Sequence, residues 1–246
     1  MADHLRLKLE HYVRISADDR ARISALTEFN VRQIRSRRDL IREGEPPQFV
    51  NLVLDGWAVR HKMLEDGRRQ IMAFLIPGDL CDLNVFILNE MDHSIGALTE
   101  LTVAQIPREV LDEIDRKHPR LMQALEWDLL VQFAIQREWT INLGQRSAIE
   151  RIAHLICELF ARLKAVGLCV DGTCHIPITQ TDLSEATGIT PVHVNRILQE
   201  LRGEGLIEWK GREIHVPDMD ALKRIAMFND NYLHLNKEGS HLDANE

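Results

Sequence analysis

The sequence predicts an α+β protein made of an N-terminal antiparallel β-roll, a long central helix and a C-terminal winged helix-turn-helix. Three observations support this: turn signals recur about every ten residues in the first part, a glycine-free stretch with helical periodicity follows, and the punctuation of two short helices comes last. Because each part has its own periodicity, we expect separate structural units. The predicted boundaries are 1–118, 119–143, 144–220 and 221–246, the last unit being a C-terminal helix with a polar tail.

Composition limits the class of protein. The chain has 246 residues, of which 45% are hydrophobic and 28% are charged, as in globular proteins. No apolar run approaches the ~18 residues of a membrane helix, and the first residues lack the apolar core of a signal peptide. The four cysteines are sparse, which suits a reducing compartment. We therefore expect a cytoplasmic protein with no membrane partner.

The β-roll is predicted from turn motifs that alternate with short apolar runs. The motifs REGEPP, VLDG, EDGRR and IPGDL separate the runs FVNLVL, WAVRHKML and QIMAFLI, and SIGALTELTVAQI adds a further strand pair. Within these motifs, Asp66-Gly67 is typical of a tight hairpin. We expect the roll to span residues 35–107, with helices in residues 5–30 that lean on it.

Residues 119–143 contain no glycine, and their apolar side chains recur at three- and four-residue steps. A helix of this length is about 35 Å long. Its apolar stripe predicts a seam that pairs with a second copy of the chain, and packing on its own β-roll alone is the alternative. Leu130 and Ile135 are apolar but lie off the seam. This favours a helix that contacts both its own β-roll and a second copy of the chain. Gly144 follows, where we expect a hinge. The predicted seam residues are Met122, Leu125, Leu129, Phe133 and Trp139, with Gln136 and Leu143 on the same stripe.

The segment at residues 179–202 has the punctuation of a helix-turn-helix. Thr179 with Asp182 three residues later predicts a capped helix start, and Gly188 predicts the tight turn after that helix. Thr190 then caps a second helix, which has Pro191 in its first position. After this helix, LIEWKGREIHV alternates like a strand pair, which predicts a wing. The stripe that the second helix should bury is Val194, Ile197, Leu198 and Leu201.

The opposite face of the second helix is polar and predicts contact with DNA. Arginine offers a bidentate fork to guanine, while asparagine and glutamine match adenine. The net charge of −8 does not exclude DNA, because a local basic face can lie on an acidic body. A helical hairpin used only for packing is the alternative. The candidate base-reading residues are Val192, Asn195, Arg196 and Gln199. The candidate contacts to the DNA backbone are Thr179, Thr190, His193, Arg202, Lys210 and Arg212.

The order of β-roll, long helix, glycine and winged helix-turn-helix resembles the Crp/Fnr family of bacterial transcription regulators. The similarity covers roughly residues 20–220 and includes IREGE, LVLDGWAV, EDGRRQ, FLIPGDL, NLGQRSAIERIAHLICEL and TPVHVNRILQEL. The resemblance implies the jelly roll of cyclic-nucleotide-binding domains and a homodimer joined through the long helix. It also implies three partners: double-stranded DNA with a two-fold-related site, a second copy of the chain, and RNA polymerase. Arg196 falls where the family carries its arginine for guanine, whereas Val192 stands where many members have a glutamate.

The resemblance also indicates what the roll could bind. Nucleotide-binding members have a Gly-Glu-Leu stretch and an Arg-Ser pair, and the corresponding residues here are Cys81-Asp82-Leu83 and His93-Ser94. The shorter acid and a histidine without a bidentate fork predict that cyclic nucleotides do not bind. A cyclic-nucleotide-responsive regulator is the alternative. The candidate effector pocket is Cys81, Asp82, Leu83, His93, Ser94 and Gln136, and the effector itself is not identified.

Metal and haem sites have weaker support. No cysteine precedes Cys81, which excludes the N-terminal iron–sulfur cluster of some family members. Haem would need axial ligands such as Cys81 and His93, whose spacing is not distinctive. Cys169 and Cys174-His175 lack a paired motif and a fourth zinc ligand, and they should lie in a loop before the helix-turn-helix.

Two other classes of protein complete the alternatives. A cupin-like metal enzyme needs clustered histidine and glutamate ligands, whereas His61 and His93 are isolated in the sequence. A signalling subunit would use the C-terminal domain to bind protein instead of DNA. We expect no catalytic residue, no metal and no cofactor.

Overall fold

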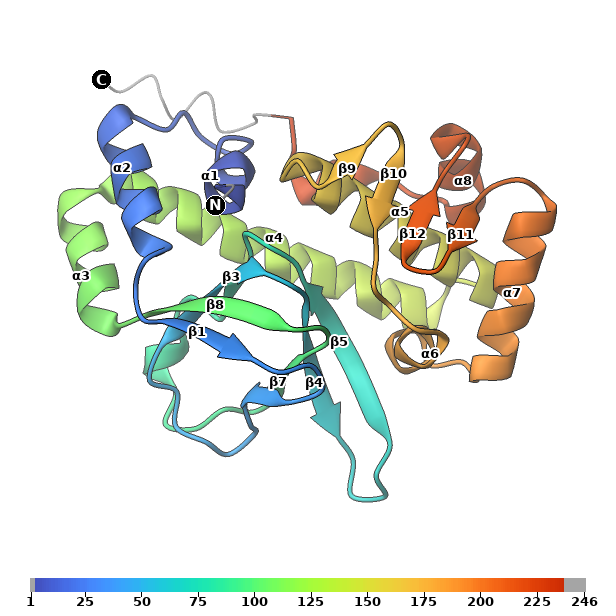
Figure 1. Ribbon diagram of the computed structural model, residues 1–246, viewed down its shortest axis with the longest axis horizontal. Helices are drawn as coiled ribbons and strands as arrows, with labels where there is room; N and C mark the ends of the chain where they lie inside the picture. Colours follow the sequence, from blue (N-terminus) through green and yellow to red (C-terminus); the bar gives the residue numbers. More distant parts are fainter. Residues whose placement is uncertain (1–2, 237–246) are drawn as a thin grey trace.

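The computed structural model describes residues 3–236, so the polar tail expected after Lys237 lies outside the described residues. The β-roll occupies one end of the molecule and the winged helix-turn-helix the other, and the long helix α4 (Pro119–Gly144) runs along both (Figure 1). The α+β class predicted from the sequence is confirmed. None of the helices within residues 3–236 is long and apolar enough to cross a membrane.

In the sequence, two helices precede the roll and the remaining helices follow it. The N-terminal helical region consists of two helices, which are separated by the non-helical residues 10–16. The helices besides α4 are α1 (His4–Leu9), α2 (Ala17–Leu26), α3 (Arg108–Lys117), α5 (Ala148–Ala165), α6 (Gln180–Thr187), α7 (Pro191–Gly203) and α8 (Met219–Ala226), with 3-10 turns η1 (Val85–Ile87) and η2 (Asp230–Leu233).

The roll consists of two four-stranded antiparallel sheets, with strand orders β1-β8-β3-β6 and β2-β7-β4-β5. It begins at Val31, slightly before the predicted start. Both sheets contribute buried apolar side chains to one core, and the inner strands β3 and β8 are buried along most of their length. Its strands are β1 (Val31–Ile34), β2 (Asp39–Ile41), β3 (Val50–Asp55), β4 (Ala58–Met63), β5 (Arg69–Leu75), β6 (Leu80–Cys81), β7 (Ser94–Ala97) and β8 (Leu101–Ile106).

A buried ionic network joins the roll to the helices, and its centre is Asp79. Asp79 follows the turn after β5, where Gly78 has a φ of 93° and a Cβ would meet the backbone of His4 at 2.9 Å. One oxygen of Asp79 accepts from Lys8 Nζ at 2.7 Å, and the other accepts from Arg162 Nη2 at 2.8 Å. Burial by itself would raise the pKa of Asp79, but these two cations hold it below its ordinary value. Asp79 is therefore a charged link between the roll, α1 and α5.

The same network extends along α4. Asp128 lies 2.6 Å from Lys8 Nζ and accepts from the Tyr12 hydroxyl at 3.2 Å. Glu158 on α5 accepts from the indole of Trp139 at 3.2 Å and from the hydroxyl of Tyr232 at 3.1 Å. All of these groups are buried, so each charge depends on its partners rather than on water.

The turn between α4 and α5 is braced by arginines. Arg146 donates to Asn142 at 2.9 Å, and Arg151 donates to the carbonyl of Leu143 at 3.2 Å and to that of Thr187 on α6. Gly144 is the last residue of α4, its φ is not positive, and a Cβ there would meet nothing within 4 Å. Nothing in the backbone at this position requires a glycine.

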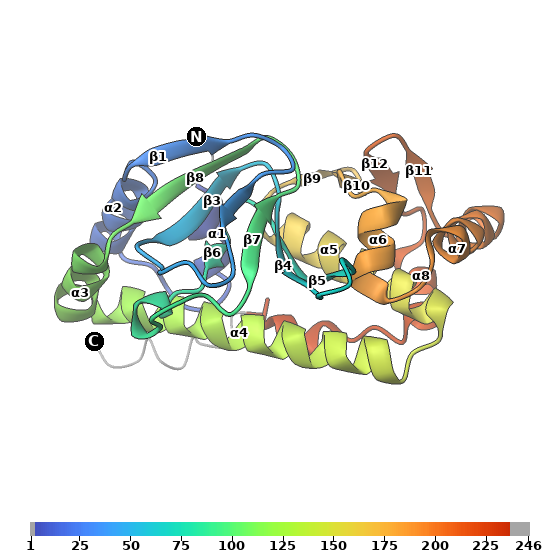
Figure 2. The same ribbon diagram turned by 90° about the horizontal axis from the view of Figure 1, so that it is seen from below.

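The outward face of α4 differs from the predicted seam. Leu125 and Trp139 are buried inside the chain, because this side of α4 packs on the roll and α5; the Trp139 ring lies 6.0 Å from that of Phe74. The prediction that these two residues face a partner is wrong. Leu130, expected off the seam, is instead 63% exposed, and Phe133 is 51% exposed. Ile135 is buried, Ile141 and Leu143 continue the exposed face, and Met122 and Leu129 are half-buried. In Figure 2, α4 forms the lower edge of the molecule.

The buried imidazole of His154 predicts a loss of stability in acid. His154 lies on α5, stacked 6.1 Å from Tyr232, and burial together with Arg146 lowers its pKa from 6.5 to about 3. The unfolded chain therefore binds an extra proton between these values, and stability falls as the pH drops through that window. We expect His154→Gln to remove roughly 2 kcal/mol of the destabilisation that wild type suffers between about pH 6.5 and 4.5.

The measurement is urea unfolding at a series of pH values. His175→Gln changes an exposed histidine and should follow the wild-type curve. Parallel curves for wild type and His154→Gln would mean that folding does not lower the pKa of His154.

Candidate nucleic-acid interface

The helix-turn-helix forms because each local signal in the sequence is satisfied. The Thr179 hydroxyl caps α6, and the carboxylate of Asp182 accepts from the Thr179 amide at 2.9 Å, which completes a capping box. Gly188 ends α6 with a φ of 69°. Thr190 caps α7 through the amide of His193, and Pro191 takes the first helical position. These four predictions are confirmed.

The two faces of α7 separate as predicted. The buried face is Val194, Ile197, Leu198 and Leu201, and the exposed residues include Val192, Asn195, Arg196 and Gln199. The exposed residues are partly ordered by their neighbours. Arg196 donates to His193 Nε2 at 2.9 Å, and Asn195 accepts from Gln180 of α6 at 3.4 Å. The candidate base-reading side chains therefore share one open surface.

The wing completes the domain. A four-stranded sheet of order β11-β12-β10-β9 packs behind the helices, and Gly211 makes the turn at the wing tip with a φ of 62°. Lys210 and Arg212 flank this turn and are exposed. The strands are β9 (Cys169–Val170), β10 (Thr173–His175), β11 (Glu208–Lys210) and β12 (Glu213–His215).

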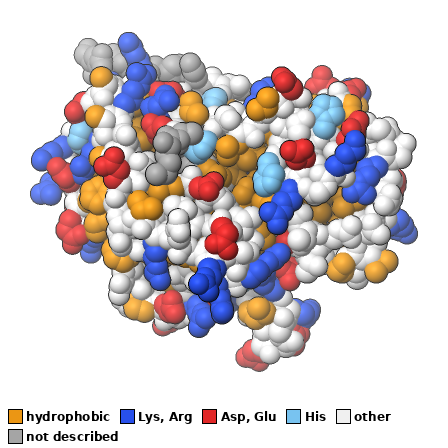
Figure 3. Space-filling model, viewed as in Figure 1, with side chains coloured by type: hydrophobic (Ala, Val, Ile, Leu, Met, Phe, Trp, Pro, Cys, Tyr) orange, Lys and Arg blue, Asp and Glu red, His pale blue; other side chains and the backbone are white. Residues whose placement is uncertain are grey.

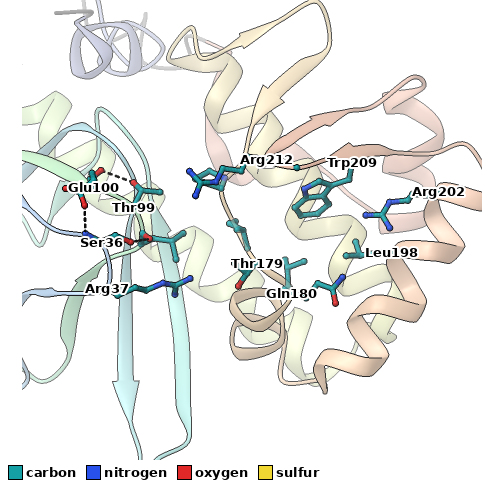
Figure 4. A pocket seen from close by; sticks show the side chains of 15 residues that line it. Ser36, Arg37, Thr99, Glu100, Thr179, Gln180, Leu198, Arg202, Trp209 and Arg212 are labelled. Atoms are coloured by element: carbon teal, nitrogen blue, oxygen red, sulfur yellow. Dashed lines mark hydrogen bonds between the residues drawn. The ribbon is translucent and has the colours of Figure 1, made fainter.

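A cleft of about 670 Å³ separates the roll from the helix-turn-helix. Three of the candidate backbone contacts, Thr179, Arg202 and Arg212, line it, whereas Thr190, His193 and Lys210 do not. In Figure 4, Trp209 of the wing and Arg37 of the roll lie on opposite sides of this cleft. Lys and Arg side chains are prominent beside it on the molecular surface (Figure 3). The cleft therefore places Arg202 and Arg212, together with Glu100, next to α7.

Next to this cleft, the roll contacts α6 directly. Arg37 Nη1 donates to Asp182 at 2.9 Å, Arg69 lies 2.9 Å from Glu185, and Gln70 donates to the carbonyl of Ala186 at 3.4 Å. Burial alone would raise the pKa of Asp182, but hydrogen bonds from Arg37 and Thr179 hold it below its ordinary value. Asp182 thus caps α6 and anchors it to the roll.

Sequence reasoning missed these roll residues. Arg37 belongs to the RSRR run at residues 35–38, which is a visible cluster of positive charge. It has a φ of 62°, a conformation that non-glycine residues rarely adopt and that is enriched at functional sites. The charge cluster could have signalled a role, but its partner on α6 lies 145 positions away.

The interior of the roll brings together part of the candidate effector pocket. Asp82 accepts from Arg60 Nη2 at 2.8 Å and lies 3.1 Å from His93 Nε2. Burial would lower the pKa of His93, but Asp82 outweighs it and raises this pKa. The other candidates point elsewhere: Ser94 accepts from the amide of Glu43, and Gln136 donates to the carbonyl of Met72. Cys81 and Leu83 are buried.

Within residues 3–236 no group of three or more His, Cys, Asp or Glu residues is placed to hold a metal ion. Cys169 and Cys174 lie in the β9–β10 hairpin rather than in a loop, and they form a disulfide. The sequence alone did not anticipate this pairing.

The fold and the exposed α7 define a winged helix-turn-helix DNA-binding protein with a cyclic-nucleotide-type β-roll. Residues 31–118 match the cyclic nucleotide-binding domain family, and residues 150–225 match the Crp-like helix-turn-helix domain family. The chain is 28% identical over 195 residues to a probable transcriptional activator of Rhizobium leguminosarum bv. viciae, covering 79% of this chain and 80% of that protein. It is 30% identical over 159 residues to the nitrogen fixation regulation protein FixK of Bradyrhizobium diazoefficiens, covering 65% of each.

Solved structures agree with this assignment. The structure of FixK2 from Bradyrhizobium japonicum is similar with a TM-score of 0.72 and 25% identity, covering 80% of this chain and 96% of that one. A CRP/FNR-family regulator from Thermus thermophilus shares the fold, with a TM-score of 0.61 and 20% identity, covering 81% of this chain and 99% of that one. The chain belongs to the Crp/Fnr family of transcription regulators and is a DNA-binding regulator of transcription.

The ion pair between Arg60 and Asp82 predicts that cyclic nucleotides do not bind. A cyclic phosphate would have to displace Asp82 from Arg60, and the Asp82 carboxylate would repel it. We expect no binding heat and no rise in melting temperature with millimolar cyclic AMP or cyclic GMP. Calorimetry against a cyclic-nucleotide-binding relative as positive control checks this, and micromolar binding would contradict it.

Proposed function

We propose that this chain works as a homodimer that places two copies of α7 in the major groove of an inverted-repeat DNA site. The observation that carries the proposal is the exposed face of α7, where Val192, Asn195, Arg196 and Gln199 lie together. An α-helix fits the major groove, and side chains with these donor and acceptor patterns match base edges there. Val192, which is 81% exposed, suits an apolar contact with a thymine methyl group.

The remaining candidates position the DNA rather than read it. Thr179 and Thr190 stand at the N-termini of α6 and α7, where the helix dipole attracts a phosphate. Arg202 of α7 and Lys210 and Arg212 of the wing supply cations, and His193 orients Arg196. The affinity of an acidic chain for DNA then rests on this local surface.

The exposed face of α4 is proposed as the dimer contact. Leu130, Phe133 and Ile141 would otherwise leave a row of apolar side chains in water. Their spacing of three and eight residues keeps them on one side of the helix. In this proposal the protein is not an enzyme and needs no cofactor, and RNA polymerase is the further partner that such a DNA-bound dimer would contact.

Charge on this face should separate the dimer. We expect the double variant Leu130→Glu with Phe133→Glu to be monomeric, because two carboxylates per chain would meet their copies in a low-dielectric contact. Both side chains are exposed in the single chain, so each monomer should keep its fold. Light scattering measures the mass, and Val31→Glu, an exposed apolar residue on β1, is the matched control. A double variant that stays dimeric would place the contact elsewhere.

Removing the Arg196 side chain should relax specificity at one base pair in each half-site. If Arg196 makes two hydrogen bonds to a guanine, we expect Arg196→Ala to weaken the free energy of DNA binding by about 1–3 kcal/mol per half-site. Lys210→Ala should weaken all sequences alike and reduce the dependence on salt. Binding-site selection with wild type and both variants checks this, and the wild-type site should be an inverted repeat with half-sites about one helical turn apart. An unchanged sequence preference in Arg196→Ala would make Arg196 a phosphate contact.

A further inference from the structure

The β9–β10 hairpin carries two cysteines directly opposite each other. Its turn consists of Asp171 and Gly172, both with positive φ, which is the geometry of a two-residue hairpin turn. This register pairs Cys169 with Cys174 at a Cα–Cα distance of 4.5 Å, and a disulfide joins them. Side chains of such a pair project from the same side of the sheet, so the hairpin itself brings the two sulfurs together.

The other two cysteines are isolated and unreactive by environment. Cys81 lies in the roll and Cys157 on α5, and both are buried. Burial raises the pKa of Cys157 to about 12 and also raises that of Cys81, so neither thiol ionises readily near neutral pH. Among the four cysteines, Cys169 and Cys174 are the two that lie close enough together to interconvert between thiols and a disulfide.

The function of the protein makes a permanent cross-link an unexpected feature. A transcription regulator acts on the chromosome, in a compartment where thiols are kept reduced, and disulfides formed there are usually transient and redox-sensing. The two cysteines are also only five positions apart. Closing so short a loop constrains the unfolded chain less than closing a long one would. The bond therefore adds little to the stability of the folded state.

We propose that Cys169 and Cys174 form a reversible dithiol–disulfide site that responds to hydroperoxides and changes the affinity for DNA. The half-exposed Cys169 thiolate attacks the peroxide oxygen and becomes a sulfenic acid, which releases an alcohol or, from hydrogen peroxide, water. Cys174 then attacks that sulfur, forms the disulfide and releases water. The two thiols supply the two electrons that reduce the peroxide, and a dithiol reductant reverses the step.

The hairpin is connected to the DNA-binding surface through the wing sheet. Cys174 pairs with Ile214 of β12, and the amide of Ile176, two residues further on, donates to the carbonyl of Arg212 at 2.7 Å. The chain then reaches Thr179, the cap of α6. Breaking the bond forces the two sulfurs apart to van der Waals distance, and Cys174 is only 1% exposed. In this proposal the hairpin backbone takes up part of the displacement and moves the wing with it.

The described geometry, with Arg212 and the α6 cap in place, contains the disulfide. We therefore expect the oxidised protein to bind DNA more tightly, by about three- to tenfold, than the reduced protein. This inference rests on the DNA-binding function, so its test has readouts with and without DNA.

The experiment compares full-length protein treated with hydrogen peroxide and with dithiothreitol. Mass spectrometry after thiol alkylation should find the pair joined in the first sample and alkylated twice in the second. Hydrogen exchange should be faster in residues 166–178 and 208–215 of the reduced protein. Titration with the DNA obtained by binding-site selection should give the affinity difference. Cys169→Ser should behave as the reduced protein under both treatments, and Cys157→Ala should keep the full response.

The outcomes separate the two hypotheses. A pair that stays as thiols after peroxide treatment, or a disulfide that leaves both exchange and DNA affinity unchanged, would overturn the redox site. Redox-dependent exchange in a protein that binds no DNA in either state would contradict the DNA-binding proposal instead.

Discussion

The rest of the structure depends on the buried carboxylate of Asp79. It accepts from Lys8 and Arg162 and thereby joins the roll to α1 and α5, while Lys8 also reaches Asp128 on α4. Removing one partner from such a network leaves an uncompensated buried charge and typically costs about 3–5 kcal/mol. Apolar contacts persist when two elements shift slightly against each other, whereas short charged hydrogen bonds require one relative position of the elements that they join. The roll, α4 and α5 are consequently locked in a single arrangement at this point.

The elements joined at Asp79 also contact the DNA-binding domain, because both α5 and the roll bind helix α6. At the far end of α5, Arg151 donates to the carbonyl of Thr187 on α6. From the roll, Arg37 donates to Asp182 near the start of the same helix. Helix α6 is thus held at both ends by groups outside the helix-turn-helix. In a dimer built on α4, these two contacts would determine the separation and angle of the two α7 helices, and hence the spacing of the DNA half-sites.

Three charged groups inside the roll of this chain pair with one another. Arg60, Asp82 and His93 neutralise one another where nucleotide-binding relatives are expected to hold a phosphate. The roll also contacts the DNA-binding domain directly, through Arg37, Arg69 and Gln70 against α6. The cysteine hairpin proposed as a redox site lies outside the roll, in the wing sheet itself.

Local features of this protein could be read from the sequence because they depend on neighbours along the chain. The capping box of Thr179, the turn at Gly188 and the buried stripe of α7 all involve residues within a few positions. The outward face of α4 could not, because Leu125 and Leu130 are the same residue type and only their packing distinguishes them. The partners of Asp79 and Asp182 lie 71 to 145 positions away, and the chain must fold before such groups meet. Periodicity tells which residues are apolar or capped, whereas the choice of a distant polar partner is made by how the elements pack.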